Sequence, residues 1–138
     1  MPSFTIGVDG GDHLTIHALS AAKPIHKHYD WVDVEISVRA GGFTGSFSAS
    51  FMTHDFAAFR SGLEQIYREL SGSTKFETTE EQLEFMISGD GKGHFGVSGV
   101  AQDIVGTGNK LEFQFYIDQT YLPVIIRELD EILTEYPT

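Results

Sequence analysis

The chain has 138 residues, 41% of them hydrophobic and 12% aromatic, which is the composition of a packed domain rather than of a disordered acidic tail. Its 20 acidic and 9 basic residues give a formal net charge of -11, which disfavours binding to nucleic acid or to an anionic membrane and favours a basic protein partner. The absence of cysteine excludes disulfides, thiolate nucleophiles and cysteine metal sites. The N-terminus shows no signal-peptide pattern, and no apolar run approaches the ~20 residues that cross a bilayer, so we expect a single soluble, cytoplasmic domain over residues 1–138.

Alternating apolar and polar residues predict four strands in the first half of the chain. These strands are residues 4–8, 13–19, 30–40 and 43–51. The last two are predicted to form a hairpin, because Gly41 and Gly42 supply the turn between them. Residues 20–28 are predicted to be a loop, since they contain Pro24 and have no regular period.

A change of period marks the next element. From Thr53 to Leu70 the apolar residues recur at helical spacing, which predicts an amphipathic helix. Thr53 or Asp55 is expected to cap its first turn, and Gly72 is expected to end it in a left-handed conformation.

The second half of the chain repeats the alternating pattern and closes with a second helix. The predicted strands are residues 74–77, 83–88, 94–101 and 110–118. A glycine-rich hairpin loop at 89–93 and a loop at 102–109 separate them, and the closing helix runs from Gln119 to Tyr136 with Pro123 in its first turn. Short turns imply antiparallel pairing, and one apolar stripe per helix implies that both helices cover the same side. We therefore predict an α+β fold in which an antiparallel β-sheet has two α-helices packed on one face.

Two loop segments invite comparison with ligand sites. His26 and His28 could hold a metal ion together with Asp30, since imidazole and carboxylate suit zinc, but two loop histidines more often face solvent. Residues 89–93 lack the Gly-Lys-Ser/Thr ending of a phosphate-binding loop and precede a predicted strand instead of a helix. The hairpin interpretation is therefore preferred for 89–93.

Carboxylates and nucleophiles give no stronger signal for catalysis. Asp33, Glu35 and Glu112 all point outward on predicted strands, where no cleft is expected to raise the pKa of one of them. The chain has no Gly-x-Ser-x-Gly motif. We predict that the protein is not an enzyme and has no cofactor and no metal site.

A protein-binding surface is the better-supported alternative. If both helices cover one face of the sheet, the other face presents aromatic and acidic side chains together, and such surfaces favour binding of a basic partner. The predicted partner-binding residues are Trp31, Asp33, Glu35, Arg39, Glu112, Gln114, Tyr116 and Asp118. Trp31 is equally well explained as a structural residue at the end of the sheet.

Five segments of the chain, at 38–47, 55–60, 67–72, 106–109 and 118–123, resemble bacterial proteins of the WapI immunity family. The recurring features are an Arg-Ala-Gly-Gly-Phe segment, a Phe-rich first helix and a Gln-Thr-Tyr-Leu-Pro entry to the last helix, and the resemblance spans about residues 30 to 136. It implies a small cytoplasmic antidote that binds the toxic C-terminal domain of a polymorphic secreted toxin, often a nuclease.

These observations together predict a non-enzymatic, acidic immunity protein that binds and neutralises a cognate toxin domain, expected to be basic. A nuclease needs a basic surface to hold phosphates, so an acidic antidote can bind it rapidly and block its substrate by resembling the substrate's charge. Two alternatives stay open. One is a self-associating or regulatory interaction domain, including a homodimer, and the other is a small-ligand or metal-binding protein that uses His26 and His28.

Overall fold

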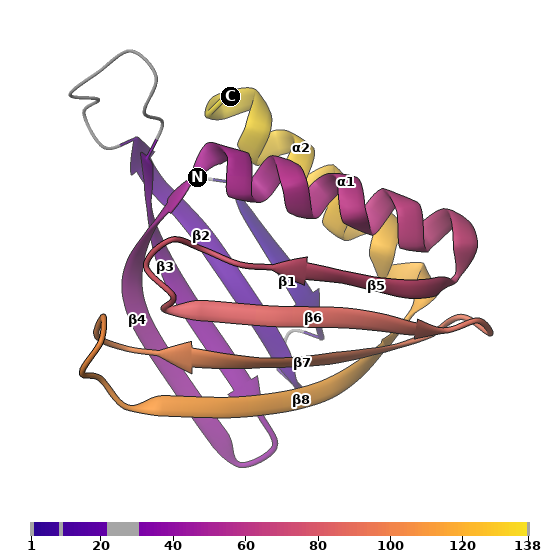
Figure 1. Cartoon of the computed structure of the whole chain (residues 1–138), viewed down its shortest axis with the longest axis horizontal. Coiled ribbons are helices and arrows are strands. Elements are labelled where there is room, and N and C mark those ends of the chain that lie inside the picture. The colour runs from indigo at the N-terminus through magenta and orange to yellow at the C-terminus, as the bar shows by residue number, and fades with distance from the viewer. Residues whose placement is uncertain (1, 9, 22–30, 138) are drawn as a thin grey trace.

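The computed structural model describes residues 2–8, 10–21 and 31–137, so the predictions for Pro24, His26, His28 and Asp30 lie outside the described residues. Eight strands and two α-helices are assigned within the described ranges (Figure 1). In chain order they are β1 (Ser3–Gly7), β2 (His13–Ala21), β3 (Trp31–Ala40), β4 (Phe43–Met52), α1 (Thr53–Glu69), β5 (Ser71–Phe76), β6 (Leu83–Asp90), β7 (His94–Gln102), β8 (Lys110–Asp118), a 3-10 turn (Gln119–Tyr121) and α2 (Leu122–Glu135).

The strands form two antiparallel sheets, sheet A in the order β1-β2-β3-β4 and sheet B in the order β5-β6-β7-β8. The predicted α+β class with antiparallel strands and two helices is confirmed. The prediction differs in one respect, since the helices do not lie on one face of a single sheet. α1 starts at the residue after β4 and spans about 25 Å, and β5, which follows it, pairs with β6 and not with a strand of sheet A.

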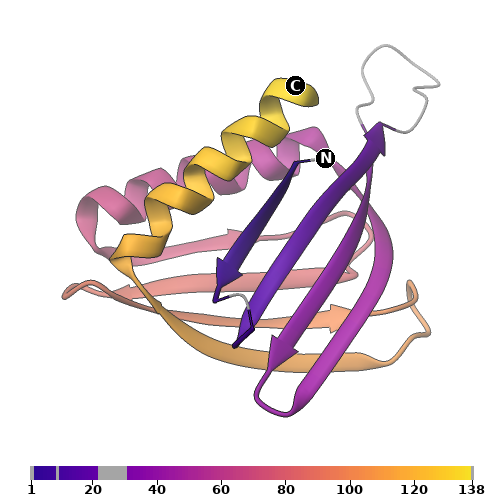
Figure 2. The same cartoon turned by 180° about the vertical axis from the view of Figure 1, so that it is seen from behind.

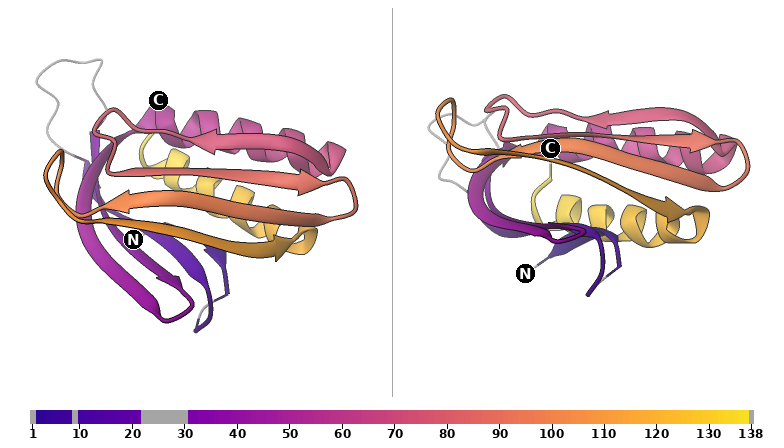
Figure 3. Two further views of the ribbon diagram at one scale, coloured as in Figure 1. Left: turned by 60° about the horizontal axis from the view of Figure 1, so that its bottom comes forward. Right: turned by 90° about the horizontal axis from the view of Figure 1, so that it is seen from below.

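The two sheets turn their inner faces toward each other, and their strands cross at a large angle (Figures 1 and 3). α1 and α2 lie side by side along the open side of this sandwich, where α1 contacts β5 and α2 contacts β1. Seen from behind, α2 runs beside β1 at the edge of sheet A (Figure 2). Neither α1 nor α2 therefore covers an outer face of the sandwich.

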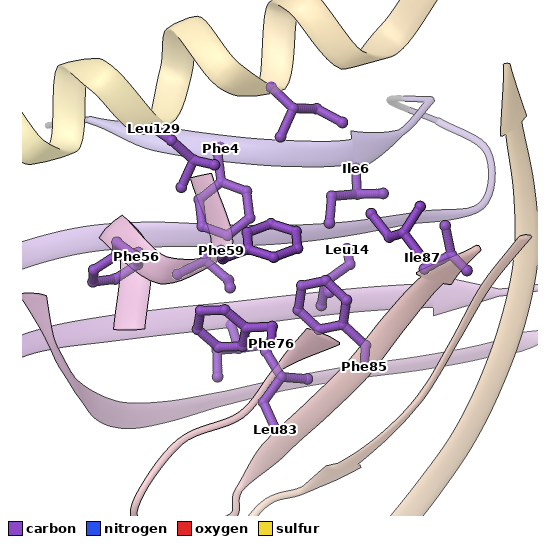
Figure 4. Close-up of a cluster of buried hydrophobic side chains, with 14 of the residues drawn as sticks. Phe4, Ile6, Leu14, Phe56, Phe59, Phe76, Leu83, Phe85, Ile87 and Leu129 are labelled. Atoms are coloured by element: carbon purple, nitrogen blue, oxygen red, sulfur yellow. The ribbon is translucent and has the colours of Figure 1, made fainter. Parts of the chain in front are cut away.

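The core is built from phenylalanines that meet at the junction of the three layers (Figure 4). The Phe76 ring centroid lies 5.2 Å from that of Phe51 on sheet A, 5.5 Å from that of Phe59 on α1 and 5.2 Å from that of Phe85 on sheet B. These residues are all at most 2% exposed. Aromatic pairs at such distances add ~0.5–1.5 kcal/mol each to the burial of their surface, so this cluster joins both sheets and α1.

The ends of α1 differ in part from the prediction. Asp55 caps the first turn by accepting a hydrogen bond from the Met52 backbone N–H at 3.0 Å, whereas Thr53 is already the first helical residue. The prediction that Gly72 supplies the left-handed end of the helix is wrong, because Leu70 has φ 58° there and Ser71 already begins β5. Leu70 packs against the core, and its backbone N–H bonds to the Ile66 carbonyl at 2.7 Å, which offsets the cost of the left-handed conformation.

Helix α2 begins after the 3-10 turn, and Pro123 lies in its first turn as predicted. Farther along, the Glu128 carboxylate accepts a hydrogen bond from the Thr5 backbone N–H at 3.1 Å. Because β1 is an edge strand of sheet A, this contact satisfies a backbone N–H that has no neighbouring strand to bond to.

Candidate protein-binding face

The structure divides the eight predicted partner-binding residues between the two sheets. Trp31, Asp33, Glu35 and Arg39 lie on β3 of sheet A, and Glu112, Gln114, Tyr116 and Asp118 lie on β8 of sheet B. All of them alternate with buried residues and so point outward. Because the sheets pack through their inner faces, the two groups occupy different outer faces and do not form one surface.

On the outer face of sheet A the carboxylates already have hydrogen-bond partners within the protein. Glu35 accepts bonds from the hydroxyls of Ser46 at 3.0 Å and Ser48 at 2.8 Å, and Asp33 accepts one from Ser50 at 2.7 Å. Both acids are half-buried among these small side chains. A partner would have to break these bonds to use the carboxylates, so this half of the predicted surface is less suited to binding.

The two remaining β3 residues have local roles. Trp31 is half-buried at the first position of β3, opposite Met52 of β4. Arg39 is exposed and donates from Nη1 to the Gly10 carbonyl at 3.2 Å. Trp31 therefore fits the structural alternative, a residue at the end of the sheet.

The outer face of sheet B combines apolar and acidic side chains, and we call it the β6–β8 face. Cross-strand pairing aligns Met86 with Ser98 and Gln114, and it aligns Glu84 with Val100 and Glu112. The β6–β8 face consists of Glu84, Met86, Ser98, Val100, Glu112, Gln114, Tyr116 and Asp118. A shallow groove of about 480 Å³ runs across it beside Val100 and Glu112.

Tyr116 is the most prominent side chain of the β6–β8 face, with 79% of its surface exposed. Its ring lies across Gly96 of β7, where an added Cβ atom would be 3.6 Å from the ring. Met86, two strands away, is 37% exposed. An exposed aromatic ring that contacts the strand beside it offers apolar area to a partner, as interface anchors do.

The acids at one end of the β6–β8 face are held in the ionised state. Hydrogen bonds from the side chain and backbone N–H of Thr120 lower the pKa of Asp118 below its usual range. The pKa of the neighbouring Asp90 is lowered too, mainly by the backbone N–H of Lys92 and also by His94. These carboxylates therefore stay negative below neutral pH, and Glu84 and Glu112 add two exposed acids at the other end.

Sequence reasoning missed the contributions of β6 and β7 to this face, namely Glu84, Met86, Ser98 and Val100. The alternation within 83–88 already placed Glu84 and Met86 outward. What the sequence did not contain is which strands are neighbours, since that depends on the division into two sheets.

The alternative sites do not assemble among the described residues. Asp33 and Glu35 lie on one sheet and Glu112 on the other, so they do not form a carboxylate pair. The part of the chain that the structure describes contains no group of three or more His, Asp or Glu that could hold a metal ion. Residues 89–93 join β6 to β7 as a hairpin, as predicted. No helix over 2–8, 10–21 and 31–137 is long and apolar enough to span a membrane.

Comparison with known proteins gives one strong match. The model of the immunity protein WapI-like family matches residues 5–137, nearly the whole chain. No curated protein matches the sequence. Among solved structures, a chain from "Crystal structures of trypanosoma bruciei MRP1/MRP2" is similar at 14% identity and a TM-score of 0.47, over 98% of this chain and 86% of that one. A likeness at that TM-score is too weak to support a conclusion.

Proposed function

We propose that this chain, which belongs to the immunity protein WapI-like family, is a non-enzymatic immunity protein that binds and neutralises a cognate toxin domain through its β6–β8 face. Family membership supports an immunity function in general. The finer statement, that a basic toxin domain occupies this particular face, rests on the chemistry of the face. The single observation that carries it is Tyr116, which is 79% exposed on the same face as the exposed acids Glu84 and Glu112.

Charge favours this partner. At a net charge of -11 the protein attracts a basic surface over a distance of about one Debye length, ~8 Å at physiological salt. Glu84 and Glu112 are exposed, and among the described residues no ion pair includes either of them, so they are available to a partner's Lys and Arg side chains. A toxin domain that must hold a phosphate backbone would present such a surface.

Contact area favours the β6–β8 face over the outer face of sheet A. Tyr116 and Met86 provide apolar area near the acids, and aromatic anchors with a polar rim are typical of protein interfaces. The corresponding positions on sheet A are small hydroxyl side chains such as Ser46 and Ser48, which provide little contact area and already bond to Glu35.

The experiment compares two double substitutions that remove equal charge from the two outer faces. Glu84→Gln/Glu112→Gln changes the β6–β8 face, and Asp33→Asn/Glu35→Gln is the matched control on sheet A. The toxin domain encoded beside this protein is the ligand, and its dissociation constant is measured by calorimetry, together with rescue of cells that express it. We expect the first variant to bind about tenfold or more weakly and the second to bind nearly as the native protein does.

Tyr116→Ala tests the anchor itself. Truncation of an aromatic hot spot costs ~2 kcal/mol or more, equivalent to about 30-fold in the dissociation constant. Because the ring is exposed, thermal unfolding should change little. Weaker binding of the sheet A variant alone would place the interface on sheet A and contradict the proposal, and the absence of any binding by the native protein would contradict the toxin partner.

A further inference from the structure

Strand β4 forms an open edge of sheet A. Within the described residues β4 pairs with β3 alone, and the Gln82 side chain bonds to one of its carbonyls, that of Ser48. At the opposite edge, β1 lies beside α2 and bonds to Glu128. Proteins usually protect such edges with charged residues, proline or a bulge, yet the ten residues Phe43–Met52 contain no charge and no proline, and their register with β3 is regular. The edge is thus free to pair with another strand.

Two observations show which backbone groups of β4 point away from β3. Ala40 and Phe43 are opposite each other across the two-residue turn at Gly41 and Gly42, and such flanking residues bond to each other. The orientation alternates along a strand, so the N–H and C=O groups of Thr44 and Ser46 point outward. Ser48 follows the same pattern, because its carbonyl accepts a bond from Gln82 Nε2 at 3.4 Å instead of from β3.

A groove with both apolar and polar lining residues accompanies the free part of this edge. Residues 43–47 form one wall, and Ala101 with residues 109–111 forms the other, around a cavity of about 240 Å³. Phe43 is 69% exposed here, and Phe47 and Leu111 are partly buried. The tip of the β3–β4 hairpin projects beyond β8 (Figures 1 and 3), so a strand can approach β4 from the side.

We propose that a second copy of this chain occupies this edge, by antiparallel pairing of its own β4 about a twofold axis at Gly45. In this register Thr44 of one copy is opposite Ser46 of the other, so each exchanges both outward backbone hydrogen bonds with its partner. Phe43 is then opposite Phe47 on the side that faces the groove. The strand is self-complementary, because the residues two positions before and after Gly45 are both phenylalanine.

The charge distribution is compatible with contact between two copies at β4, although the rest of the acidic surface would repel a second copy. Two molecules of charge -11 repel each other, but β4 is uncharged and the groove carries one acid and one base, Asp103 and Lys110. The twofold axis lets the acid of one copy face the base of the other. Only about five residues per strand take part, so the dimer is expected to be weak and to depend on concentration.

A cysteine at the proposed axis gives the most direct test, since the protein has no cysteine of its own. Cα atoms of a non-hydrogen-bonded antiparallel pair are ~4.5 Å apart, within the range of ~4.4–6.8 Å that a disulfide spans. A Cβ atom at Gly45 would lie 3.4 Å from the Val38 side chain, so the substitution fits. Gly45→Cys should give a disulfide-linked dimer on mild oxidation, and Tyr116→Cys, at a more exposed position on sheet B, should not.

A proline tests the backbone hydrogen bonds without a cysteine. Ser46→Pro removes an N–H that points away from β3, together with the hydroxyl that bonds to Glu35, so the pairing with β3 should persist and the dimer should be lost. Ser46→Ala is the matched control, because it removes the hydroxyl but keeps the N–H and so should dimerise as the native protein does. Sedimentation velocity at increasing protein concentration measures the dimer, and circular dichroism measures folding.

These experiments test the β4 dimer without any toxin. Their outcome is therefore independent of whether the protein binds a toxin domain through its β6–β8 face. Concentration-dependent dimerisation that Ser46→Pro abolishes, with a Gly45→Cys disulfide, supports the β4 dimer. A native protein that stays monomeric up to its solubility limit overturns it, and so does a dimer that Ser46→Pro leaves unchanged. Capture of a peptide by the β4 edge of a monomer would show that the edge binds another partner, which also overturns the proposal.

Discussion

At Gly62, α1 lies directly against Thr74 of β5. A Cβ atom on Gly62 would overlap the Thr74 hydroxyl and lie only 2.8 Å from the Thr74 Cβ atom. In an exposed helix, replacement of glycine by alanine stabilises by ~1 kcal/mol. Here we expect Gly62→Ala to lower the free energy of unfolding by ~1–3 kcal/mol, because the helix must move away from the sheet. Chemical denaturation measures this change.

Ser61 provides the control for Gly62, since it is the preceding residue of the same helix and is exposed. Ser61→Ala should be neutral or stabilise by a few tenths of a kcal/mol. A Gly62→Ala variant that is as stable as the native protein, or more stable, as Ser61→Ala is expected to be, would contradict the close contact between α1 and β5.

Glu128 links stability to pH through its position at the edge of sheet A. Burial raises the pKa of this carboxyl above its ordinary value of 4.5, and Glu131 raises it further, although the Thr5 N–H and Arg127 act in the opposite direction. A raised pKa in the folded state means that Glu128 contributes stability below the unfolded pKa and loses it as the pH rises through the folded pKa. Folding thus disfavours the charged carboxylate of Glu128 relative to the neutral carboxyl, compared with the unfolded chain.

Glu128→Gln tests this linkage, because the amide oxygen can still accept the Thr5 hydrogen bond without a charge. We expect the variant to gain stability relative to the native protein as the pH rises from about 4 to about 7. Melting temperatures of both proteins across this range measure the difference. A relative loss of stability by the variant over the same range would mean that the charged hydrogen bond outweighs burial.

At the scale of elements, Gln82 joins sheet B to the edge of sheet A. Its buried Nε2 lies 3.4 Å from the carbonyl oxygen of Ser48, 3.3 Å from that of Gln102 and 3.2 Å from that of Asp103. The two N–H groups of this amide are thus shared among a carbonyl of β4, one at the end of β7 and one in the loop after β7. The loop between β5 and β6 is held against both sheets by this side chain.

Gln82→Met keeps the shape of the side chain and removes its donors. We expect it to lower the free energy of unfolding by ~1–3 kcal/mol, since the buried carbonyl of Gln102 and the partly buried ones of Ser48 and Asp103 lose a partner. Gln114→Met on the exposed side of β8 is the control and should change stability by less than ~0.5 kcal/mol. Equal stability of the two variants in urea denaturation would assign Gln82 no role in joining the sheets.

The individual elements were largely predictable from the sequence because burial follows a local period. The alternation in 31–40 and 110–118 and the helical stripe from Phe56 to Ile66 correspond to the buried positions of β3, β8 and α1. The end of α1 was not predictable from local preference. Leu70 adopts a conformation that favours glycine because its side chain is anchored in the core, and a core contact is not visible in the local sequence.

At the scale of the whole molecule, the division of the eight strands into two sheets limited how much of the candidate site could be predicted from the sequence. Each predicted residue on β3 and β8 does point outward, as the alternation required. Whether Glu35 and Glu112 share a face depends on which strands pair across α1, and nothing in the local pattern specifies this. The β6–β8 face became visible only when the register placed Met86 and Glu84 beside the β8 residues.

The net charge of -11 acts on the two proposed contacts in opposite directions. A basic toxin domain is attracted to the β6–β8 face, so added salt should raise its dissociation constant. Two copies that meet through uncharged β4 edges repel each other overall, so added salt should strengthen their dimer. Calorimetry of the toxin complex and sedimentation velocity of the free protein across a sodium chloride series measure the two responses.

The two contacts also use different sheets, so they are compatible in one assembly. A dimer through β4 of sheet A leaves both β6–β8 faces free, and we expect it to bind two toxin domains. Light scattering at high protein concentration should then give the mass of two immunity proteins with two toxins, and Ser46→Pro should reduce this to one of each without weakening the toxin contact. Loss of toxin binding in Ser46→Pro would contradict this assignment, since one surface would then have to serve both partners. A salt response of equal sign for both contacts would contradict the proposed charge of one of them.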